Sequence, residues 1–234
     1  MAAVHLRKVR SFVRRPGRLT AAQRRALDDL LPRFGAPPGA LDLGALFGRS
    51  SRRVLDIGFG DGEAMVTSAL NYADIDYQGI EVHEPGIGHL LLLLEKTGLT
   101  NVRLIARDAA DVIPELLGEG SFDAVNLFFP DPWPKKRHHK RRLVQPAFMA
   151  EIARVLVPGG LFHAATDWAE YAVHTRSVLV GDTRFAPVAA EDLCHNPLAF
   201  RPSTKFERRG RRLGHDVVDL YYRRLGTEPE TSTR

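Results

Sequence analysis

The sequence predicts an α/β fold, with a mainly parallel sheet and helices on both of its faces. Strand-like and helix-like patterns alternate along most of the chain, and consecutive parallel strands need a crossover connection, usually a helix. The chain has 234 residues, 44% of them hydrophobic, which is enough for one large core and too little for two. We therefore expect one domain with appendages.

Five segments are short apolar runs bounded by Gly, Pro or acidic residues, the pattern of buried strands. They cover residues 52–60, 76–82, 101–108, 122–130 and 159–167. In a parallel sheet the ligand binds at the carboxyl ends of the strands. The residues at the end of each run are therefore the first candidates for a site.

Helical patterns separate these strands. They cover residues 63–70, 84–98, 112–117 and 143–156. In the last segment apolar residues recur at 3.6-residue spacing, and the second is expected to stop at Gly98. A further helix is predicted near the N-terminus, because Thr20 and Gln23 have capping-box spacing before a helical pattern of leucines.

Basic residues are concentrated in three segments. Residues 1–25 carry eight Lys or Arg and no acid, residues 135–142 carry six, and residues 201–212 carry six beside one Glu. Together these segments carry +19 against a net charge of +5 for the whole chain, so the remainder is acidic. An acidic body with three basic patches is typical of a nucleic-acid binder with a separate catalytic body, and a small-molecule enzyme does not need it.

The cellular compartment follows from cysteine usage and hydropathy. The single Cys194 cannot form an intrachain disulfide, which favours a reducing cytosol. The longest leucine run, Leu90 to Leu94, is too short to span a bilayer. The Arg-rich N-terminus has the composition of a mitochondrial transit peptide, but the capping box that follows it indicates that the segment enters structure. We expect a cytoplasmic protein without a membrane segment.

The first predicted strand runs into a glycine-rich turn, Asp56-Ile-Gly58-Phe-Gly60-Asp-Gly62. Glycine lets the backbone turn sharply and approach a ligand closely. The spacing G-x-G-x-G differs from the G-x-G-x-x-G that seats a pyrophosphate, and an acid before the turn repels phosphate. The turn suits a ligand with a positive amino or sulfonium group.

Two more acids follow the next strands. Glu81 lies nineteen residues after Gly62, where a carboxylate can accept hydrogen bonds from both hydroxyls of a ribose. Asp108, beside Ala109, is placed to accept from an adenine amino group. Taken singly, each acid is more often a helix N-cap or a solvated residue. Three of them in register at successive strand ends predict a nucleoside site.

The fourth predicted strand leads into PDPWPKKRHHKRR, residues 130–142. Pro130 and Pro132 restrict the backbone around Asp131 and lower the entropy cost of holding its carboxylate. Trp133 is expected to stack on a base or to wall the pocket, with ordinary packing as an equal alternative. The basic strip that follows is placed for phosphate contacts beside the pocket, and its adjacent histidines lack the spacing of a metal site.

Two downstream segments offer further polar groups. Asp167 ends the fifth predicted strand and can accept from guanine N–H groups or cap the following helix, with Thr166 as the alternative cap. Thr204 and Glu207 have capping-box spacing, which competes with a role in substrate binding.

These motifs resemble those of a known family. VLDIGFGDG, GIEV and the acid after the third strand are similar to the S-adenosylmethionine site of the Rossmann-like methyltransferases. FFPDPWPKKRHHKRRL, with TDWAEY and STKFE downstream, closely resembles the bacterial tRNA (guanine-N7)-methyltransferases. The resemblance runs from RSFVRRPGRLTAAQ to DLYYRR, nearly the whole chain. The string PDPWPKKRH is specific to that family, whereas the glycine turn is common to many enzymes.

The resemblance implies a Rossmann-like methyltransferase fold with a mainly parallel seven-stranded sheet. It also implies methyl transfer from S-adenosylmethionine to N7 of guanosine 46 in the tRNA variable loop. From the motifs and the resemblance together, the predicted cofactor-binding residues are Asp56, Gly58, Gly60, Gly62, Glu81, Asp108, Ala109 and Asp131. The predicted substrate-binding residues are Lys135, Arg137, His138, Lys140, Arg141, Arg142, Asp167, Thr204, Lys205, Phe206 and Glu207.

Two positions depart from the family pattern. The family usually has Glu where Asp56 stands, so we expect the shorter side chain to reach the methionine amino group through a water molecule. Phe206 stands where the family often has Tyr, which removes a hydrogen bond. Neither departure affects the reaction class. Residues 1–48 are predicted as a basic arm and linker, residues 49–226 as the methyltransferase domain, and residues 227–234 as a polar tail.

The chemistry of guanine N7 defines what the site must do. N7 is a lone-pair nucleophile with no proton to lose, so the reaction needs no general base and depends on in-line positioning. We predict Asp131 as the catalytic residue, because a fixed carboxylate there can orient the guanine and follow the positive charge from sulfur to the base.

Two other functions remain open. An adenine amino-group methyltransferase uses a similar acid, proline and aromatic turn after its fourth strand, and a non-catalytic RNA-binding protein can retain the same fold. The methylated position in the product nucleoside distinguishes the adenine methyltransferase from a guanine-N7 methyltransferase. A lack of S-adenosylmethionine binding would indicate the RNA-binding protein. We expect tRNA as the partner, no membrane, no metal, and a monomer, with a homodimer as the alternative.

Overall fold

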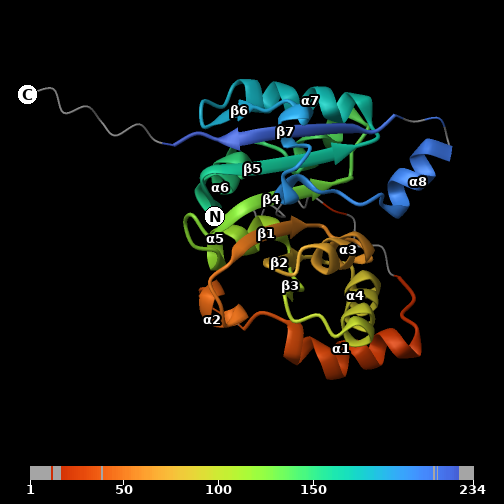
Figure 1. Ribbon diagram of the computed structural model, residues 1–234. Coiled ribbons are helices and arrows are strands. Elements are labelled where there is room, and N and C mark those ends of the chain that lie inside the picture. The colour runs from red at the N-terminus through yellow and green to blue at the C-terminus, as the bar shows by residue number, and fades with distance from the viewer. Residues whose placement is uncertain (1–11, 13–16, 38, 213, 215, 227–234) are drawn as a thin grey trace, which may run out of the picture.

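The computed structural model describes residues 12, 17–37, 39–212, 214 and 216–226, and for residues 205, 206, 209 and 211 it describes the backbone. In these residues seven strands form one sheet in the order β3-β2-β1-β4-β5-β7-β6 (Figure 1). The strands are β1 (Arg52–Ile57), β2 (Ile75–Ile80), β3 (Val102–Ile105), β4 (Phe122–Phe128), β5 (Leu156–Thr166), β6 (Phe185–Pro187) and β7 (Val218–Arg224).

Strand direction changes only at the β7 side of this sheet. Neighbours among β1 to β5 pair in parallel, whereas β7 runs antiparallel to β5 and β6. The predicted mainly parallel seven-stranded sheet is thus confirmed. The strand order reverses between β1 and β4, and in open α/β sheets such a switch point is where ligands bind.

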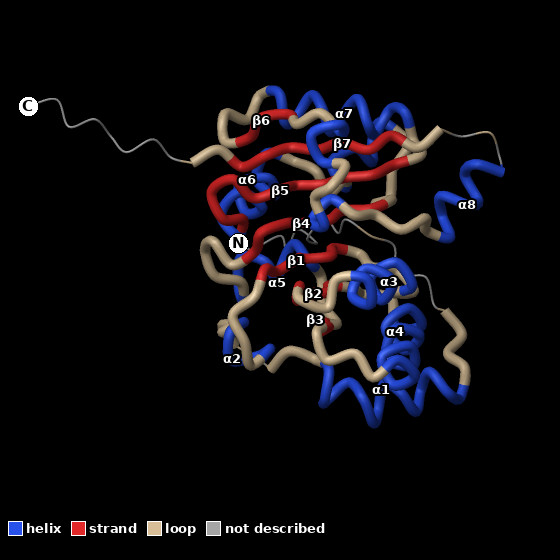
Figure 2. The backbone as a smooth tube through the Cα atoms, viewed as in Figure 1, coloured by secondary structure: helices blue, strands red, loops and turns tan. Residues whose placement is uncertain are grey.

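Helices cover both faces of the sheet (Figures 1 and 2). They are α1 (Ala21–Phe34), α2 (Leu43–Phe47), α3 (Glu63–Asn71), α4 (Glu84–Thr97), α5 (Ala109–Leu116), α6 (Pro146–Val155), α7 (Ala169–Val180) and α8 (Lys205–Arg212), with 3₁₀ helices η1 (Lys136–Arg141), η2 (Ala190–Leu193) and η3 (Pro197–Ala199). Helices α1, α3 and α4 share one core cluster, which contains Met65 and Leu90, and α5, α6 and α7 share the other, which contains Ile152 and Tyr171. No helix in the described part of the chain is both long and apolar enough to cross a membrane.

Two neighbouring predicted boundaries are wrong. The helix expected from residue 143 begins at Pro146, and the strand expected from residue 159 begins at Leu156. Proline suits the first turn of a helix, where its missing N–H costs nothing, so the helix starts there. Leu156 pairs with Phe122, and the register then shifts so that Leu161 pairs with Ala124. This irregularity takes up the Pro-Gly-Gly segment, which resembles a turn in the sequence.

The described residues before β1 pack onto the sheet domain. The predicted capping box is present, since Thr20 Oγ1 accepts from the Gln23 N–H and the Gln23 side chain accepts from the Thr20 N–H. Gln23 also donates to the Pro85 carbonyl of α4 at 3.0 Å. The expected linker contains α2, whose Leu43 is buried in the core. The domain boundaries stay a prediction. The expected tail of residues 227–234 lies outside the described residues, as do residues 1–11 and 13–16 of the expected basic arm.

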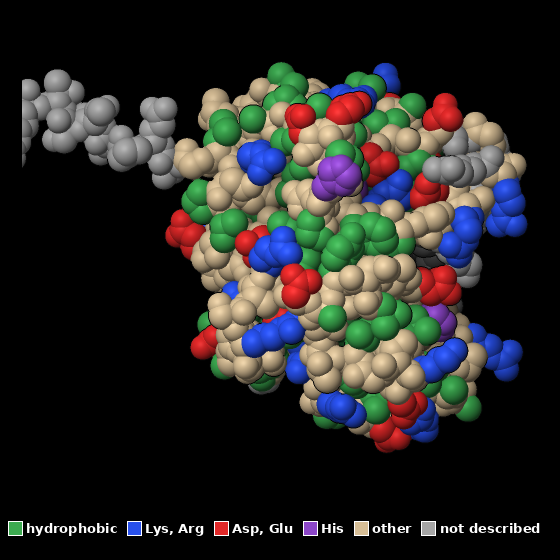
Figure 3. Space-filling model, viewed as in Figure 1, with side chains coloured by type: hydrophobic (Ala, Val, Ile, Leu, Met, Phe, Trp, Pro, Cys, Tyr) green, Lys and Arg blue, Asp and Glu red, His purple; other side chains and the backbone are tan. Residues whose placement is uncertain are grey.

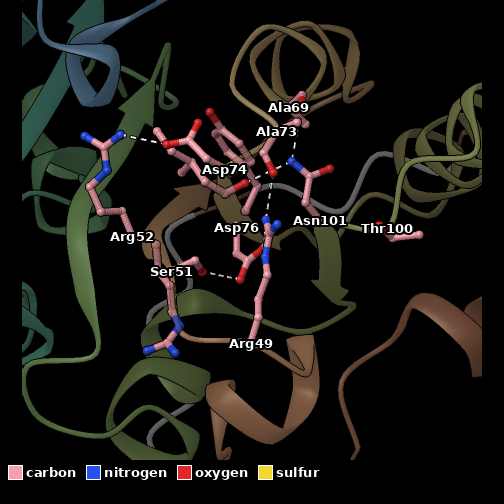
Figure 4. A network of polar contacts seen from close by, with 12 residues as sticks. Arg49, Ser51, Arg52, Ala69, Ala73, Asp74, Asp76, Thr100 and Asn101 are labelled. Carbon is pink, nitrogen blue, oxygen red and sulfur yellow. Dashed lines mark hydrogen bonds and ion pairs between the residues drawn. The ribbon is translucent and has the colours of Figure 1, made fainter.

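The amino-terminal edge of the sheet is closed by paired polar side chains (Figure 4). Asp76 at the start of β2 accepts from Arg49 Nε at 2.9 Å and from the Ser51 hydroxyl. Asn101 donates to the carbonyls of Ala69 and Ile75 at 3.2 and 2.9 Å. These groups satisfy each other's hydrogen bonds. A ligand site is therefore expected at the opposite edge, where the strands have their carboxyl ends.

Candidate active site at the carboxyl ends of the strands

A cavity of about 500 Å³ opens where β1, β2 and β4 end. The acids predicted at the strand ends meet there. Its lining includes Asp56, Gly58, Gly60, Glu81, Asp108, Ala109, Asp131, Asp167 and Thr204. The structure thus brings together most of the predicted cofactor-binding residues, and their roles as ligands stay predictions.

The glycine turn has a conformation that requires glycine. Gly58, Gly60 and Gly62 have φ angles of 73°, 64° and 79°, in the left-handed region that other residues rarely adopt. A Cβ atom on Gly62 would lie 2.7 Å from the Leu90 side chain, so this glycine lets α3 approach α4. Gly62 therefore serves packing, whereas Gly58 and Gly60 face the cavity.

Asp56 is a buried acid at the end of β1. Its side chain lines the cavity, yet the residue is only 6% exposed. Burial, and then the negative charge of Glu81, raise the pKa of Asp56 to about 7. A buried carboxylate in this setting favours a cationic partner, since pairing with a positive charge would stabilise its ionised form.

Glu81 is fixed by the backbone around it. Its Oε2 accepts from the Gly60 N–H at 3.0 Å, and its Oε1 accepts from the N–H groups of Val82 and His83 at 2.6 and 2.9 Å. These bonds connect the glycine turn to the end of β2. They preorganise the carboxylate, and Oε2 keeps capacity for a further donor.

Asp108 has the local role that the sequence left open. Its Oδ1 accepts from the Ala110 N–H at 3.0 Å, so it is the N-cap of α5. The same residue lines the cavity. The cap fixes the carboxylate direction, and a carboxylate has enough lone pairs to cap a helix and accept from a ligand.

The turn after β4 presents Asp131. Phe129 and Trp133 have φ angles of 51° and 46°, an uncommon conformation for bulky residues that is concentrated at functional sites. The Phe129 N–H donates to the Ala165 carbonyl at 2.7 Å, which holds the start of the turn against β5. Asp131 is exposed and lines the cavity.

Trp133 takes the packing alternative. It is 8% exposed and is not among the residues that line the cavity. Its ring lies 5.7 Å from the His138 ring, edge to face, and the Arg141 guanidinium lies 4.8 Å from its centroid. The prediction that Trp133 stacks on a base or walls the pocket does not agree with this placement.

Most of the basic strip, residues 135–142, forms the 3₁₀ helix η1, and its cations differ in exposure to solvent. Lys135, Arg137 and Lys140 are exposed, whereas His138 and Arg141 are half-buried beside Trp133. Burial, and then the nearby arginines and lysines, lower the pKa of His138 below its usual value. On the face drawn in Figure 3, Lys and Arg side chains are scattered among acidic and apolar ones. Phosphate contact by the strip stays a prediction.

Arg142 points inward, unlike the solvent-exposed phosphate contact that we expected. It is 3% exposed, and its Nε donates to the Pro132 carbonyl at 3.0 Å. Its Nη2 donates to Glu170 of α7 at 2.9 Å, and the guanidinium lies over the Tyr171 ring. Because these contacts satisfy the cation inside the protein, Arg142 stabilises the turn that carries Asp131.

The downstream predicted residues separate into two groups. Asp167 and Thr204 line the cavity, and Thr166 Oγ1 accepts from the Trp168 N–H at 3.2 Å as the alternative cap. Thr204 Oγ1 also accepts from the Glu207 N–H at 3.0 Å. Glu207 is 3% exposed, pairs with Arg201 and does not line the cavity, and its role in substrate binding stays a prediction. Lys205 and Phe206 lie in the first turn of α8.

Sequence reasoning missed several contributors to the site, and three of them belong together. Phe128 and Phe129 line the cavity, and Arg201 lies over both rings. No spacing rule distinguishes this arginine from its neighbours in the third basic segment. Among the described residues, no group of three or more His, Cys, Asp or Glu side chains is arranged to hold a metal ion.

Comparison with known proteins agrees with this geometry. The family described as "Putative methyltransferase" matches residues 50–220. The chain is 53% identical to the tRNA (guanine-N(7)-)-methyltransferase of Alkalilimnicola ehrlichii over 231 residues, 95% of each chain. It is 53% identical to that of Halorhodospira halophila over 220 residues, 93% of this chain and 95% of the relative.

Solved structures share the fold at lower identity. The 16S rRNA methyltransferase KamB has a TM-score of 0.55 and 15% identity, over 79% of this chain and 93% of that one. A SAM-dependent O-methyltransferase from Thermotoga maritima has a TM-score of 0.50 and 20% identity, over 80% of this chain and 64% of that one. These structures show the Rossmann-like methyltransferase fold alone. The nearly full-length identity to the curated relatives shows more: the chain belongs to the tRNA (guanine-N7)-methyltransferase family.

Proposed function

We propose that the protein transfers a methyl group from S-adenosylmethionine to N7 of guanine in tRNA, at position 46 of the variable loop. The observation that supports it is the meeting of four strand-end acids, Asp56, Glu81, Asp108 and Asp131, at one cavity. Family membership supports the same reaction.

The residues present fit S-adenosylmethionine. Burial and the negative charge of Glu81 raise the pKa of Asp56, so its buried carboxylate suits a cation such as the methionine ammonium. Glu81, fixed by three N–H donors, suits the ribose hydroxyls, and Asp108 beside Ala109 suits the adenine amino group. When bound, S-adenosylmethionine would supply an electrophilic methyl group on its sulfonium.

The protein contributes position and charge to the transfer. Since N7 has no proton to lose, no side chain is required as a general base. Asp131, on the turn fixed by Arg142, accepts from the N–H groups of the guanine and stays near the positive charge that forms on the base. Such fixed electrostatic stabilisation costs no reorganisation during the reaction.

The exposed cations next to Asp131 hold the nucleic acid. Lys135, which caps η1, and Arg137 and Lys140 of η1 are exposed, close in sequence to the turn that carries Asp131. Phosphate contacts of this kind set orientation and carry no sequence information. The base is therefore selected in the cavity and the tRNA is aligned by the strip. The protein acts in the cytoplasm, as a monomer.

The test is the identity of the methylated nucleoside. Purified protein is incubated with unmodified bulk tRNA and methyl-labelled S-adenosylmethionine, and the tRNA is digested to nucleosides. Label in 7-methylguanosine is expected, and its loss from a transcript with adenosine at position 46 would confirm the site. Label in a methyladenosine would favour the amino-group methyltransferase, and tRNA binding without label would favour an RNA-binding protein.

A further inference from the structure

A buried ion cluster lies beside the cavity and connects α8 to β7. The Arg201 guanidinium donates to both oxygens of Asp219, from Nε at 2.7 Å and from Nη2 at 2.9 Å. Its Nη1 donates to Glu207. The side chains of Arg201 and Glu207 are 10% and 4% exposed. One cation therefore holds two carboxylates from different elements in a largely dry environment.

The cluster is fixed from the sheet side. His163 of β5 places Nε2 at 2.7 Å from Asp219 Oδ1. Burial tends to raise the pKa of Asp219, but the hydrogen bonds from His163 and Arg201 outweigh it and hold that pKa at about 2. Asp219 is thus ionised at neutral pH, and it anchors the guanidinium in one position.

The cluster also contacts the cavity wall. The Arg201 guanidinium carbon lies 5.8 Å from the centroids of the Phe128 and Phe129 rings, which line the cavity. These two residues lead into the turn that carries Asp131. Arg201 therefore packs against the end of β4 and the start of the turn that carries the predicted catalytic group.

On its other side, the cluster sets the position of α8. Glu207 follows Thr204 by less than one turn, and Thr204 Oγ1, on the cavity lining, accepts its N–H. A Cβ atom on Gly210 would lie 3.0 Å from Asp167 Oδ2, so α8 also passes close to the end of β5. Without Arg201, the buried Glu207 carboxylate would lose its cation and the half-buried Asp219 would lose two hydrogen bonds, so α8 could not keep this position.

We infer that Arg201 is a positioning residue for the guanine side of the site. It holds the Thr204–Glu207 corner of α8 and the Phe128–Phe129 wall in register, so that the base is presented in line with the methyl group. The inference rests on the proposed function. It concerns the substrate side only, because Asp56 ends β1 and Glu81 follows β2, whereas His163 and Asp219 of the cluster lie on β5 and β7.

The test separates the two sides of the cavity. In Arg201→Gln, the Kd for S-adenosylmethionine stays within about twofold, whereas kcat/KM for tRNA falls on the order of 10²-fold, the size expected for a misplaced reacting group. Arg201→Lys gives an intermediate loss, since one ammonium cannot replace a bidentate guanidinium. In the double variant Arg201→Gln and Glu207→Gln, kcat/KM for tRNA falls by less than the product of the two single fold-losses, because both changes remove the same ion pair.

The matched control is Arg49→Gln, which removes a guanidinium from a buried aspartate at the other edge of the sheet. It lowers Tm and leaves kcat/KM unchanged below the unfolding transition. Unchanged tRNA kinetics in Arg201→Gln, or an equal loss of cofactor affinity, would overturn the inference. If Arg201→Gln does not fold, full activity of Arg201→Lys would overturn it.

Failure of the proposed function gives a different pattern. If the wild-type protein methylates no tRNA, amide hydrogen exchange still tests the anchoring itself. Faster exchange across residues 204–212 in Arg201→Lys than in wild type supports the positional role. Equal exchange in the two proteins contradicts it.

Discussion

Two buried aspartates on neighbouring strands have opposite surroundings. Asp76, at the amino-terminal edge of the sheet, accepts from Arg49 and Ser51 (Figure 4). Asp56, at the carboxyl-terminal edge, faces Glu81, and its pKa is raised to about 7 by burial and by that charge. A carboxylate paired inside the protein stabilises the fold, whereas one buried beside another acid weakens it. The second arrangement is the one suited to a cationic ligand.

The largest expected effect is on the chemistry at the carboxyl-terminal edge. In Asp131→Asn, kcat for tRNA methylation falls on the order of 10²-fold, because the charge that accompanies the cationic base is lost. Steady-state kinetics with tRNA measures it. Asp192→Asn, an exposed acid on η2, is the control and keeps wild-type rates. Full turnover with an unchanged KM in Asp131→Asn would refute the role.

The next effect is on stability at the opposite edge. Asp76→Asn replaces the charged acceptor of Arg49 and Ser51 by a neutral one. Arg49 keeps its hydrogen bond to the Ala73 carbonyl and its side chain is 40% exposed, so the free energy of unfolding falls by about 1–2 kcal/mol. Denaturant unfolding measures it. Activity below the transition stays unchanged, because the network in Figure 4 is remote from the cavity. A loss of activity larger than the loss of folded protein would break the contrast between the two edges.

Asp56→Asn is expected to change the free energy of unfolding in the opposite direction, and so to stabilise the ligand-free protein. Because the folded pKa of about 7 lies above the ordinary 3.8, the folded state binds a proton more tightly than the unfolded chain. Stability of the ligand-free protein therefore falls as pH rises through that window. At pH 8 the variant gains about 1–3 kcal/mol over wild type, a gain that disappears below pH 4. Denaturant unfolding curves of both proteins at pH 8 and below pH 4 measure this difference. A variant less stable than wild type at pH 8 would contradict the account.

The smallest effect concerns the basic strip. Lys140→Ala reduces the slope of log K against log salt for tRNA binding by about 1, because one phosphate contact is lost. Binding titrations at several salt concentrations measure the slope. Lys96→Ala, an exposed lysine in the last turn of α4, is the matched control and keeps the wild-type slope. Equal slopes for the two variants would remove η1 from the tRNA interface.

The sequence predicted the part of the site that depends on strand ends. Alternating strands and helices determine where a parallel sheet ends, so Asp56, Glu81 and Asp108 were found by position alone. The glycine turn could also be predicted locally, because its left-handed φ angles require glycine. The capping box at Thr20 is equally local, and the structure contains it.

The missed features depend on contacts between distant elements. Arg142 is one of six cations in its segment, and its contacts with Pro132, Glu170 and Tyr171, up to 29 residues away, turn it inward. Glu207 looks like a capping residue until Arg201 and Asp219 are placed beside it. Trp133 packs under η1 because that segment coils into a 3₁₀ helix, which charge counting cannot reveal. In each case a tertiary partner decides where the side chain points.

The most direct test of the contrast between the two aspartates is proton release on cofactor binding. Calorimetry of S-adenosylmethionine binding at pH 6.5, in buffers of different ionisation enthalpy, gives the number of protons exchanged. Because Asp56 is largely protonated there and would ionise beside the methionine ammonium, wild type releases a proton fraction that Asp56→Asn does not release. Equal proton exchange in the two proteins would contradict the assignment of Asp56 as the ammonium site.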